Sequence, residues 1–117
     1  FLERTFPLAT CFFGLMYIAD EDLPTVFGEV FRVLAPGGEF RIWDCIIPAD
    51  PPPGKDVAVC HVRVRLPDTE IATGYGAIWP TTRRDGDYYA DLARQAGFEI
   101  VEATEDEALV TLHARRP

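Results

Sequence analysis

The stretch from Leu8 to Asp44, LATCFFGLMYIADEDLPTVFGEVFRVLAPGGEFRIWD, decides the fold of this chain. Residues 8–13 are almost wholly apolar, which is typical of a strand buried on both faces of a parallel sheet. Residues 39–47, EFRIWDCII, are rich in bulky and β-branched side chains and predict a second strand. With a helix between them, the two strands form one βαβ crossover.

An amphipathic helix is expected between these two strands. Asp20 and Asp22 are acidic candidates for its N-terminal cap. Pro36 ends it, and Gly37 or Gly38 supplies the positive φ that a helix C-terminus favours. Apolar residues recur at spacings of three and four, so that one helix face must be covered by a sheet: Leu23, Val26, Phe27, Val30, Val33 and Leu34.

The middle of the chain predicts a β-hairpin over about 57–79. The proline-rich loop 48–54 separates it from the preceding strand, because proline cannot extend a ladder. Two alternating runs, 57–66 and 70–79, flank the turn residues 67–69. The first run places on one face Ala58, Cys60, Val62, Val64 and Leu66, and on the other His61, Arg63 and Arg65.

A second helix and a strand pair close the chain. Asp85 is expected to cap a helix that runs through Ala96 and stops at Gly97. Strands over 98–103 and 108–114 follow, joined by an acidic turn. The buried stripe of this helix is Tyr89, Leu92, Ala93 and Ala96.

The composition indicates one folded domain. The chain has 117 residues, of which 48% are hydrophobic, enough for one modest core. Its 19 acidic and 11 basic residues give a net charge of −8, and a chain that repels phosphates is a poor nucleic-acid binder. The paired arginines are too sparse to form a basic stripe, and we expect them to be solvated: Arg83, Arg84, Arg115 and Arg116.

Cysteine usage and hydropathy bear on the compartment. Cys11, Cys45 and Cys60 are odd in number and widely spaced, which argues against a disulfide framework and for a reducing cytoplasm. No apolar stretch reaches the roughly 18 residues that span a membrane, and no signal peptide is visible. Because the only methionine is Met16, we expect a trimmed or processed fragment.

Two blocks of sequence carry a family resemblance. The segment RVLAPGG (residues 32–38) leads into a strand, and AGFEIV (96–101) is followed by a last strand ending ALVTLHARRP (108–117). Both blocks, in this order, resemble the C-terminal half of class I S-adenosylmethionine-dependent methyltransferases. The resemblance implies an α/β fold: the C-terminal portion of a Rossmann-like methyltransferase sheet, with 1–117 as one partial domain and the hairpin inserted before the last helix.

The chain departs from the family pattern in two respects. No glycine-rich GxGxG loop follows a strand, and Gly37 and Gly38 are expected to end a helix rather than begin one. Because the first three strands of the family sheet are absent, no acidic strand end is placed to hold a ribose either. The resemblance therefore implies that most of the S-adenosylmethionine site lies outside this chain.

The candidate site residues follow from sheet topology and from the resemblance. In open α/β sheets, ligands bind beyond the carboxyl ends of the strands. By resemblance, Cys11, Phe12 and Phe13 flank the methionine part of the cofactor, while Met16 and Tyr17 face the methyl acceptor. The alternative for the apolar members of this set is that they form core.

Three further residues are candidates for the acceptor side. Asp44, a carboxylate inside an apolar strand, is either a base or orienting group, or a strand-end aspartate that caps a neighbouring loop. Tyr75 and Trp79 either line an acceptor pocket or pack the hairpin onto the sheet. No metal site is expected, since the adjacent Cys60 and His61 point to opposite faces of a strand. No serine is present for a serine hydrolase triad.

Two functions remain open at this stage. The first is part of an S-adenosylmethionine-dependent methyltransferase that acts on a small molecule. The second is a non-catalytic methyltransferase-like module that serves in assembly or ligand binding. Because the strand at 8–13 has lost a neighbour on one side, we expect a homodimer or larger assembly through that edge.

Overall fold

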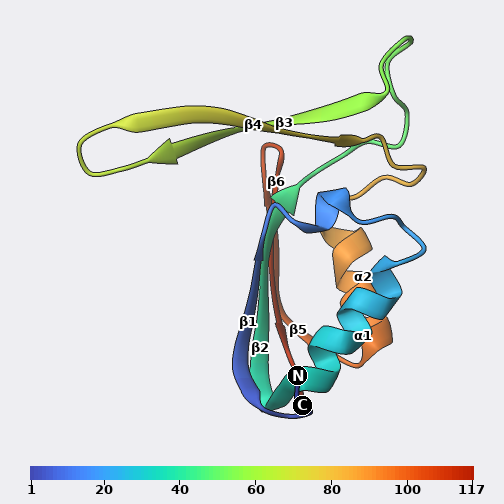
Figure 1. The fold of residues 1–117 in the computed structure, drawn as a ribbon, viewed down its shortest axis with the longest axis vertical. Helices are drawn as coiled ribbons and strands as arrows, with labels where there is room; N and C mark the ends of the chain where they lie inside the picture. Colours follow the sequence, from blue (N-terminus) through green and yellow to red (C-terminus); the bar gives the residue numbers. More distant parts are fainter.

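Four strands form the main sheet, in the order β1-β2-β6-β5 (Figure 1). β1 (Phe6–Phe12) runs parallel to β2 (Leu34–Cys45). β6 (Leu109–Arg115) pairs antiparallel with both β2 and β5 (Glu99–Asp106). This computed structural model describes residues 1–117 and confirms both the predicted crossover and the final antiparallel pair.

Two helices cover one face of this sheet, as Figure 1 shows for α1 (Leu23–Val33) and α2 (Gly86–Ala96). The Asp85 side chain accepts a 3.0 Å hydrogen bond from the Tyr88 N–H, and Gly97 ends α2 in the left-handed region at φ 108°. Both predicted caps of α2 are therefore confirmed. Neither helix has the length and apolar character of a transmembrane helix. The core between the layers is a cluster of 14 buried residues that includes Phe27, Ile42, Tyr89 and Leu112.

β1 is less buried than its composition predicted. Leu8 is 49% exposed and Phe12 is 62% exposed, so the expectation of a strand buried on both faces is wrong. β1 pairs only with β2, and both helices lie on one face of the sheet, so the other face of β1 is uncovered (Figure 1). Ala9 and Cys11 point to the helix side and pack against the core.

α1 ends three residues before Pro36, not at it. Leu34 is already extended, and the Pro36-Gly37-Gly38 segment belongs to β2. A proline at position 36 removes the N–H that would bond the Arg32 carbonyl and its ring would collide with that carbonyl, so the helix stops earlier. Gly37 does adopt a positive φ, 79°, but within the strand.

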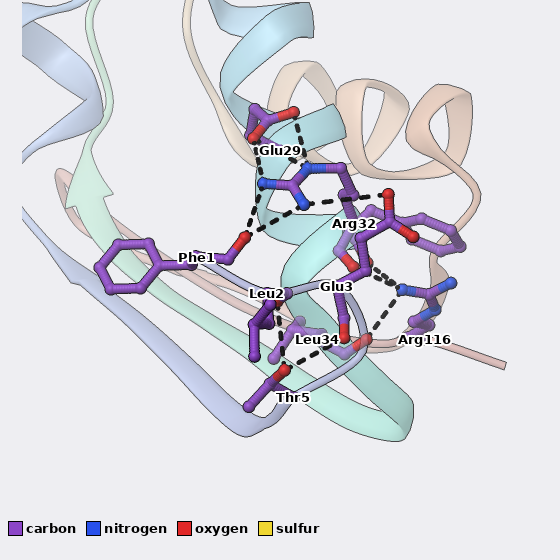
Figure 2. Close-up of polar contacts among 9 residues, drawn as sticks. Phe1, Leu2, Glu3, Thr5, Glu29, Arg32, Leu34 and Arg116 are labelled. Carbon is purple, nitrogen blue, oxygen red and sulfur yellow. Dashed lines mark hydrogen bonds and ion pairs between the residues drawn. The ribbon is translucent and has the colours of Figure 1, made fainter.

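The last carbonyls of α1 are satisfied by an arginine from the far end of the chain. Arg116 donates through Nη1 to the carbonyls of Phe31, Arg32 (3.2 Å) and Leu34 (2.8 Å), and its guanidinium lies over the Phe31 ring (Figure 2). Arg116 is only 9% exposed, so the expectation that it is solvated is wrong. This contact fastens the C-terminal residues to the end of α1.

The hairpin forms a separate two-stranded sheet. β3 (Val57–Arg65) and β4 (Glu70–Ile78) pair only with each other and extend sideways across the top of the main sheet in Figure 1. A short 3-10 helix, η1 (Leu15–Tyr17), follows β1 and lies near β4. The predicted hairpin is confirmed, and its base lies beside the carboxyl ends of β1 and β2.

Candidate functional site

A cavity of about 400 Å³ lies between η1 with its following loop and the end of β4. η1 follows the end of β1, and its Leu15 N–H bonds Asp44 near the end of β2, so this wall lies beyond the carboxyl ends of both strands, the position where ligands bind in open α/β sheets. Its wall combines apolar, aromatic and charged side chains. Among the lining residues are Met16, Tyr17, Asp20, Glu21, Trp79, Thr81 and Arg84.

Asp44, near the end of β2, fixes the position of η1 through a backbone hydrogen bond. Its Oδ2 accepts a 3.0 Å hydrogen bond from the Leu15 N–H, and its Oδ1 accepts a 2.8 Å bond from the Cys45 N–H. The side chain is fully buried. Burial raises the pKa of Asp44 above its usual range, and the N–H groups of Cys45, Leu15 and Met16 offset part of that effect. Asp44 thus caps the neighbouring loop and does not line the cavity.

Arg84 holds the same loop from the other side. Its Nη1 donates to the Leu15 carbonyl at 2.9 Å, and its Nη2 donates to the Ile18 carbonyl at 2.7 Å. Its Nε donates to Asp20 Oδ1 at 3.1 Å, so a single planar guanidinium bonds three successive parts of the loop. Arg84 is 3% exposed, and the expectation that it is solvated is wrong.

Asp20 is the acidic centre of the cavity wall. It accepts a 2.6 Å hydrogen bond from the Tyr88 hydroxyl and a 3.1 Å bond from the Thr81 hydroxyl, besides its ion pair with Arg84. Partial burial opposes ionisation, but the Tyr88 hydrogen bond and the Arg84 charge outweigh it and lower the pKa of Asp20. Burial and the hydrogen bond to Asp20 raise the pKa of Tyr88 to about 12. At neutral pH Asp20 is therefore an ionised carboxylate in the cavity wall, and Tyr88 behind it is a neutral phenol.

The hairpin forms the opposite wall. Trp79 Nε1 donates to the Pro48 carbonyl at 2.7 Å, which orients the indole that lines the cavity. Tyr75 stacks on Phe13 with 5.2 Å between ring centroids. Phe13 adopts a positive φ of 52°, which is uncommon for a bulky residue, and the stack helps to hold it there.

A disulfide joins the hairpin to the main sheet. Cys45 at the end of β2 and Cys60 in β3 are bonded, with 6.3 Å between their Cα atoms. The expectation that the chain forms no disulfide is therefore wrong, because an odd count leaves one cysteine free, here Cys11, without preventing the other two from pairing. The inference of a reducing compartment rested on that expectation and loses its basis.

The predicted site residues fall into two groups. Met16, Tyr17 and Trp79 line the cavity, whereas Tyr75 packs against Phe13 and lies outside the lining. Cys11 and Phe12 end β1 and Phe13 follows it, but the side chains diverge: Phe12 stacks on Trp43 at 4.4 Å on the uncovered face, and burial raises the pKa of the Cys11 thiol on the helix side.

The residues present do not make a complete S-adenosylmethionine site. Phe12 at the end of β1 is 62% exposed and stacks on Trp43, outside the lining of the cavity. The chain supplies no glycine-rich turn that opens a helix, and Asp44, the carboxylate at the end of β2, is buried and bonded to the backbone. No group of three or more histidine, cysteine or acidic side chains converges as a metal site would require.

Sequence reasoning missed the polar cluster that supports the cavity. Asp20 was assigned only a helix-capping role, and its partners Thr81, Arg84 and Tyr88 lie more than 60 residues away in sequence. The fully buried Tyr89 hydroxyl has no hydrogen-bond partner, and burial raises its pKa. The one available signal in the sequence was that Arg84 directly precedes the helix cap Asp85. That position would have placed Arg84 at a helix N-terminus that faces the end of the sheet.

Comparisons with known proteins support the fold. No family model and no curated protein matches the chain. An S-adenosylmethionine-dependent methyltransferase from Mesorhizobium loti is similar in structure, with 15% identity, a TM-score of 0.62, and a match covering 97% of this chain and 63% of that one. The 1,6-didemethyltoxoflavin-N1-methyltransferase from Burkholderia thailandensis has 18% identity and a TM-score of 0.59, over 97% of this chain and 45% of that one.

A third similar structure belongs to a protein with a different named activity. The [4+2]-cyclase SpnF is 15% identical, with a TM-score of 0.64 over 100% of this chain and 52% of that one. The chain thus spans 52% to 63% of the length of the first structures it matches. At these identities the likeness shows the fold alone: the chain has the mixed α/β, Rossmann-like fold of S-adenosylmethionine-dependent methyltransferases.

Proposed function

We propose that this chain forms the acceptor side of an S-adenosylmethionine-dependent methyltransferase for small molecules. The observation that carries the proposal is the 400 Å³ cavity at the carboxyl ends of β1 and β2, in a fold shared with such enzymes. Met16, Tyr17 and Trp79 give it an apolar and aromatic wall suited to an organic acceptor.

Methyl transfer requires the protein mainly to position the acceptor against the cofactor. The cofactor supplies an electrophilic methyl group, and transfer requires an electron-rich acceptor atom held in line with it and shielded from water. Here the loop after β1 is fixed by Asp44 and Arg84, so the acceptor wall is rigid. Trp79 and the end of β4 form the opposite wall of the cavity.

Calorimetric titration with S-adenosylhomocysteine tests the proposal. We expect micromolar binding once the first half of the sheet, as an upstream segment or a partner chain, completes the site. Phe12→Ala, at the end of β1, should weaken that binding, whereas Ile71→Ala, an exposed apolar change in the hairpin, should leave it unchanged. Failure to bind in the completed protein would refute the methyltransferase assignment.

The open edge of β1 supports a second candidate, an assembly module without catalytic activity. β1 has a partner on one side only, and unpaired strand edges recruit other chains. A completed protein that assembles but binds no S-adenosylhomocysteine would favour this candidate.

A further inference from the structure

The β3–β4 hairpin has few attachments to the rest of the molecule. Its strands pair only with each other, and its outer half projects beyond the main sheet in Figure 1. Apolar side chains there, Val64, Leu66 and Ile71, are all more than 40% exposed. The position of the whole arm therefore depends on the contacts at its base.

The base of the hairpin is a small core of its own. Met16, Cys45, Ile47, Ala58 and Ala77 form a buried cluster separate from the 14-residue core under the helices. The Cys45–Cys60 disulfide is part of this small core and ties β2 to β3 across a sequence separation of 15. Losing this bond would weaken the contacts that hold the base of the hairpin and leave the main core intact.

A reductant can reach the disulfide from one side. Cys45 is 1% exposed, but Cys60 is partly exposed and lines two cavities, of about 170 Å³ and 340 Å³, beneath the hairpin. The larger of these shares Met16 and Trp79 with the acceptor cavity. A change at the disulfide is thus adjacent to the wall of the candidate site.

We propose that the Cys45–Cys60 disulfide is a thiol-sensitive latch that seats the hairpin over the cavity. A dithiol reductant supplies the two electrons: its thiolate attacks the Cys60 sulfur, the S–S bond breaks, and Cys45 leaves as a thiolate that takes a proton. The second thiol of the reductant then displaces Cys60 from the mixed disulfide, which releases the Cys60 thiol and an oxidised reductant. The wall formed by Ala77 and Trp79 is then free to move away from Met16. This inference goes beyond methyl transfer and does not depend on it.

Amide hydrogen exchange before and after addition of dithiothreitol tests the latch. On reduction we expect exchange in residues 57–78 to rise by on the order of 100-fold, the factor that chain entropy gives for opening a loop with a sequence separation of 15. Exchange in β2 and β6 should stay the same. In a Trp43→Phe background Trp79 is the only tryptophan, and its emission should shift to longer wavelength on reduction.

Two variants separate the latch from other effects of the reductant. Cys45→Ala/Cys60→Ala should show fast hairpin exchange with or without dithiothreitol, and Cys11→Ala should respond as the unaltered chain does. Unchanged hairpin exchange on reduction would overturn the proposal. The proposal would also be overturned if amide exchange in β2 and β6 accelerated equally, both on reduction and in the double variant. The disulfide would then stabilise the whole fold and not the hairpin in particular.

Discussion

Arg84 is the residue on which the loop beside the cavity depends most. It bonds the carbonyls of Leu15 and Ile18 and the carboxylate of Asp20, so removing it takes the cationic donor away from all three. Asp20 then keeps only the hydroxyl hydrogen bonds of Thr81 and Tyr88. We expect Arg84→Met to lower the free energy of unfolding by about 2–4 kcal/mol. This is somewhat less than for a fully buried pair, because the Asp20 side chain is 24% exposed. Urea unfolding measures the loss.

The neighbouring arginine supplies a matched control. Arg83 pairs with Asp85 at 2.9 Å, but its side chain is 52% exposed. An exposed pair of this kind contributes little, so Arg83→Met should lower the free energy of unfolding by less than about 1 kcal/mol. Similar losses for the two variants would show that Arg84 does not hold the loop in solution.

Asp20 makes stability depend on pH in a direction that can be measured. Its pKa is lowered in the folded protein, chiefly by the Tyr88 hydrogen bond and the Arg84 charge acting against partial burial. The folded state therefore binds fewer protons than the unfolded state below about pH 4, and stability falls as the pH falls through that range. Asp44, whose pKa burial raises, has the opposite sign and loses stability as the pH rises through its folded pKa.

Replacing Asp20 isolates its share of this pH dependence. Between about pH 6 and pH 3, Asp20→Asn should lose less unfolding free energy than the unaltered chain, as judged by urea unfolding at each pH. Asp50→Asn, a change at an exposed loop carboxylate, should follow the unaltered chain. A variant curve parallel to the unaltered one at every pH would mean that Asp20 is not the group that titrates.

Secondary structure could be predicted from local patterns, whereas long-range contacts could not. The Asp85 cap, the Gly97 stop and the hairpin turn each depend on neighbours in sequence, and the structure confirms them. The carbonyls at the end of α1 are bonded by Arg116, which is 85 residues from Phe31, and nothing in the local sequence marks that pairing.

The site shows the same division between local and distant contacts. Met16, Tyr17 and Trp79 could be placed near a strand end, but the support from Arg84 and the Cys45–Cys60 bond requires the tertiary fold. The burial of β1 was overestimated for a related reason, since an apolar strand does not itself reveal whether both of its faces are covered.

Two glycines of the helical layer predict opposite effects of the same substitution. Gly97 ends α2 at φ 108°, and a Cβ there would lie 3.0 Å from Cζ of Phe31. Gly97→Ala should therefore cost about 1–2 kcal/mol, and more if Phe31 cannot move. Gly28 lies inside α1 with nothing within 4 Å of an added Cβ, so Gly28→Ala should stabilise by about 0.5–1 kcal/mol. Thermal unfolding compares the two, and the same sign for both would contradict this account of the helix layer.

The molecule as a whole has one covered and one uncovered sheet face. The helices bury the face that carries Phe40 and Ile42, while the other face presents the Phe12–Trp43 stack and charged groups around Glu39. The sheet has two edge strands, β1 and β5, and β1 is the one that leads into η1 at the cavity wall. Both features are open to contact with another chain, and the edge at β1 makes the more specific prediction.

The unpaired edge of β1 predicts self-association, which a single proline can block. The Phe13 N–H donates a 2.7 Å hydrogen bond to the Trp43 carbonyl. Because successive backbone N–H groups of a strand point to opposite sides, the N–H groups of Cys11 and Ala9 also point toward β2, and the N–H of Thr10 points to the open side. We expect the chain to sediment as a dimer or larger species at high micromolar concentration, because exposed strand edges pair with one another.

Thr10→Pro removes a donor from the open edge without removing a bond to β2, so it should shift the protein to monomer with little loss of stability. Thr10→Val keeps the N–H and should associate as the unaltered chain does. A monomeric unaltered chain would refute self-association, and a Thr10→Pro protein that still dimerises would place the interface on another surface.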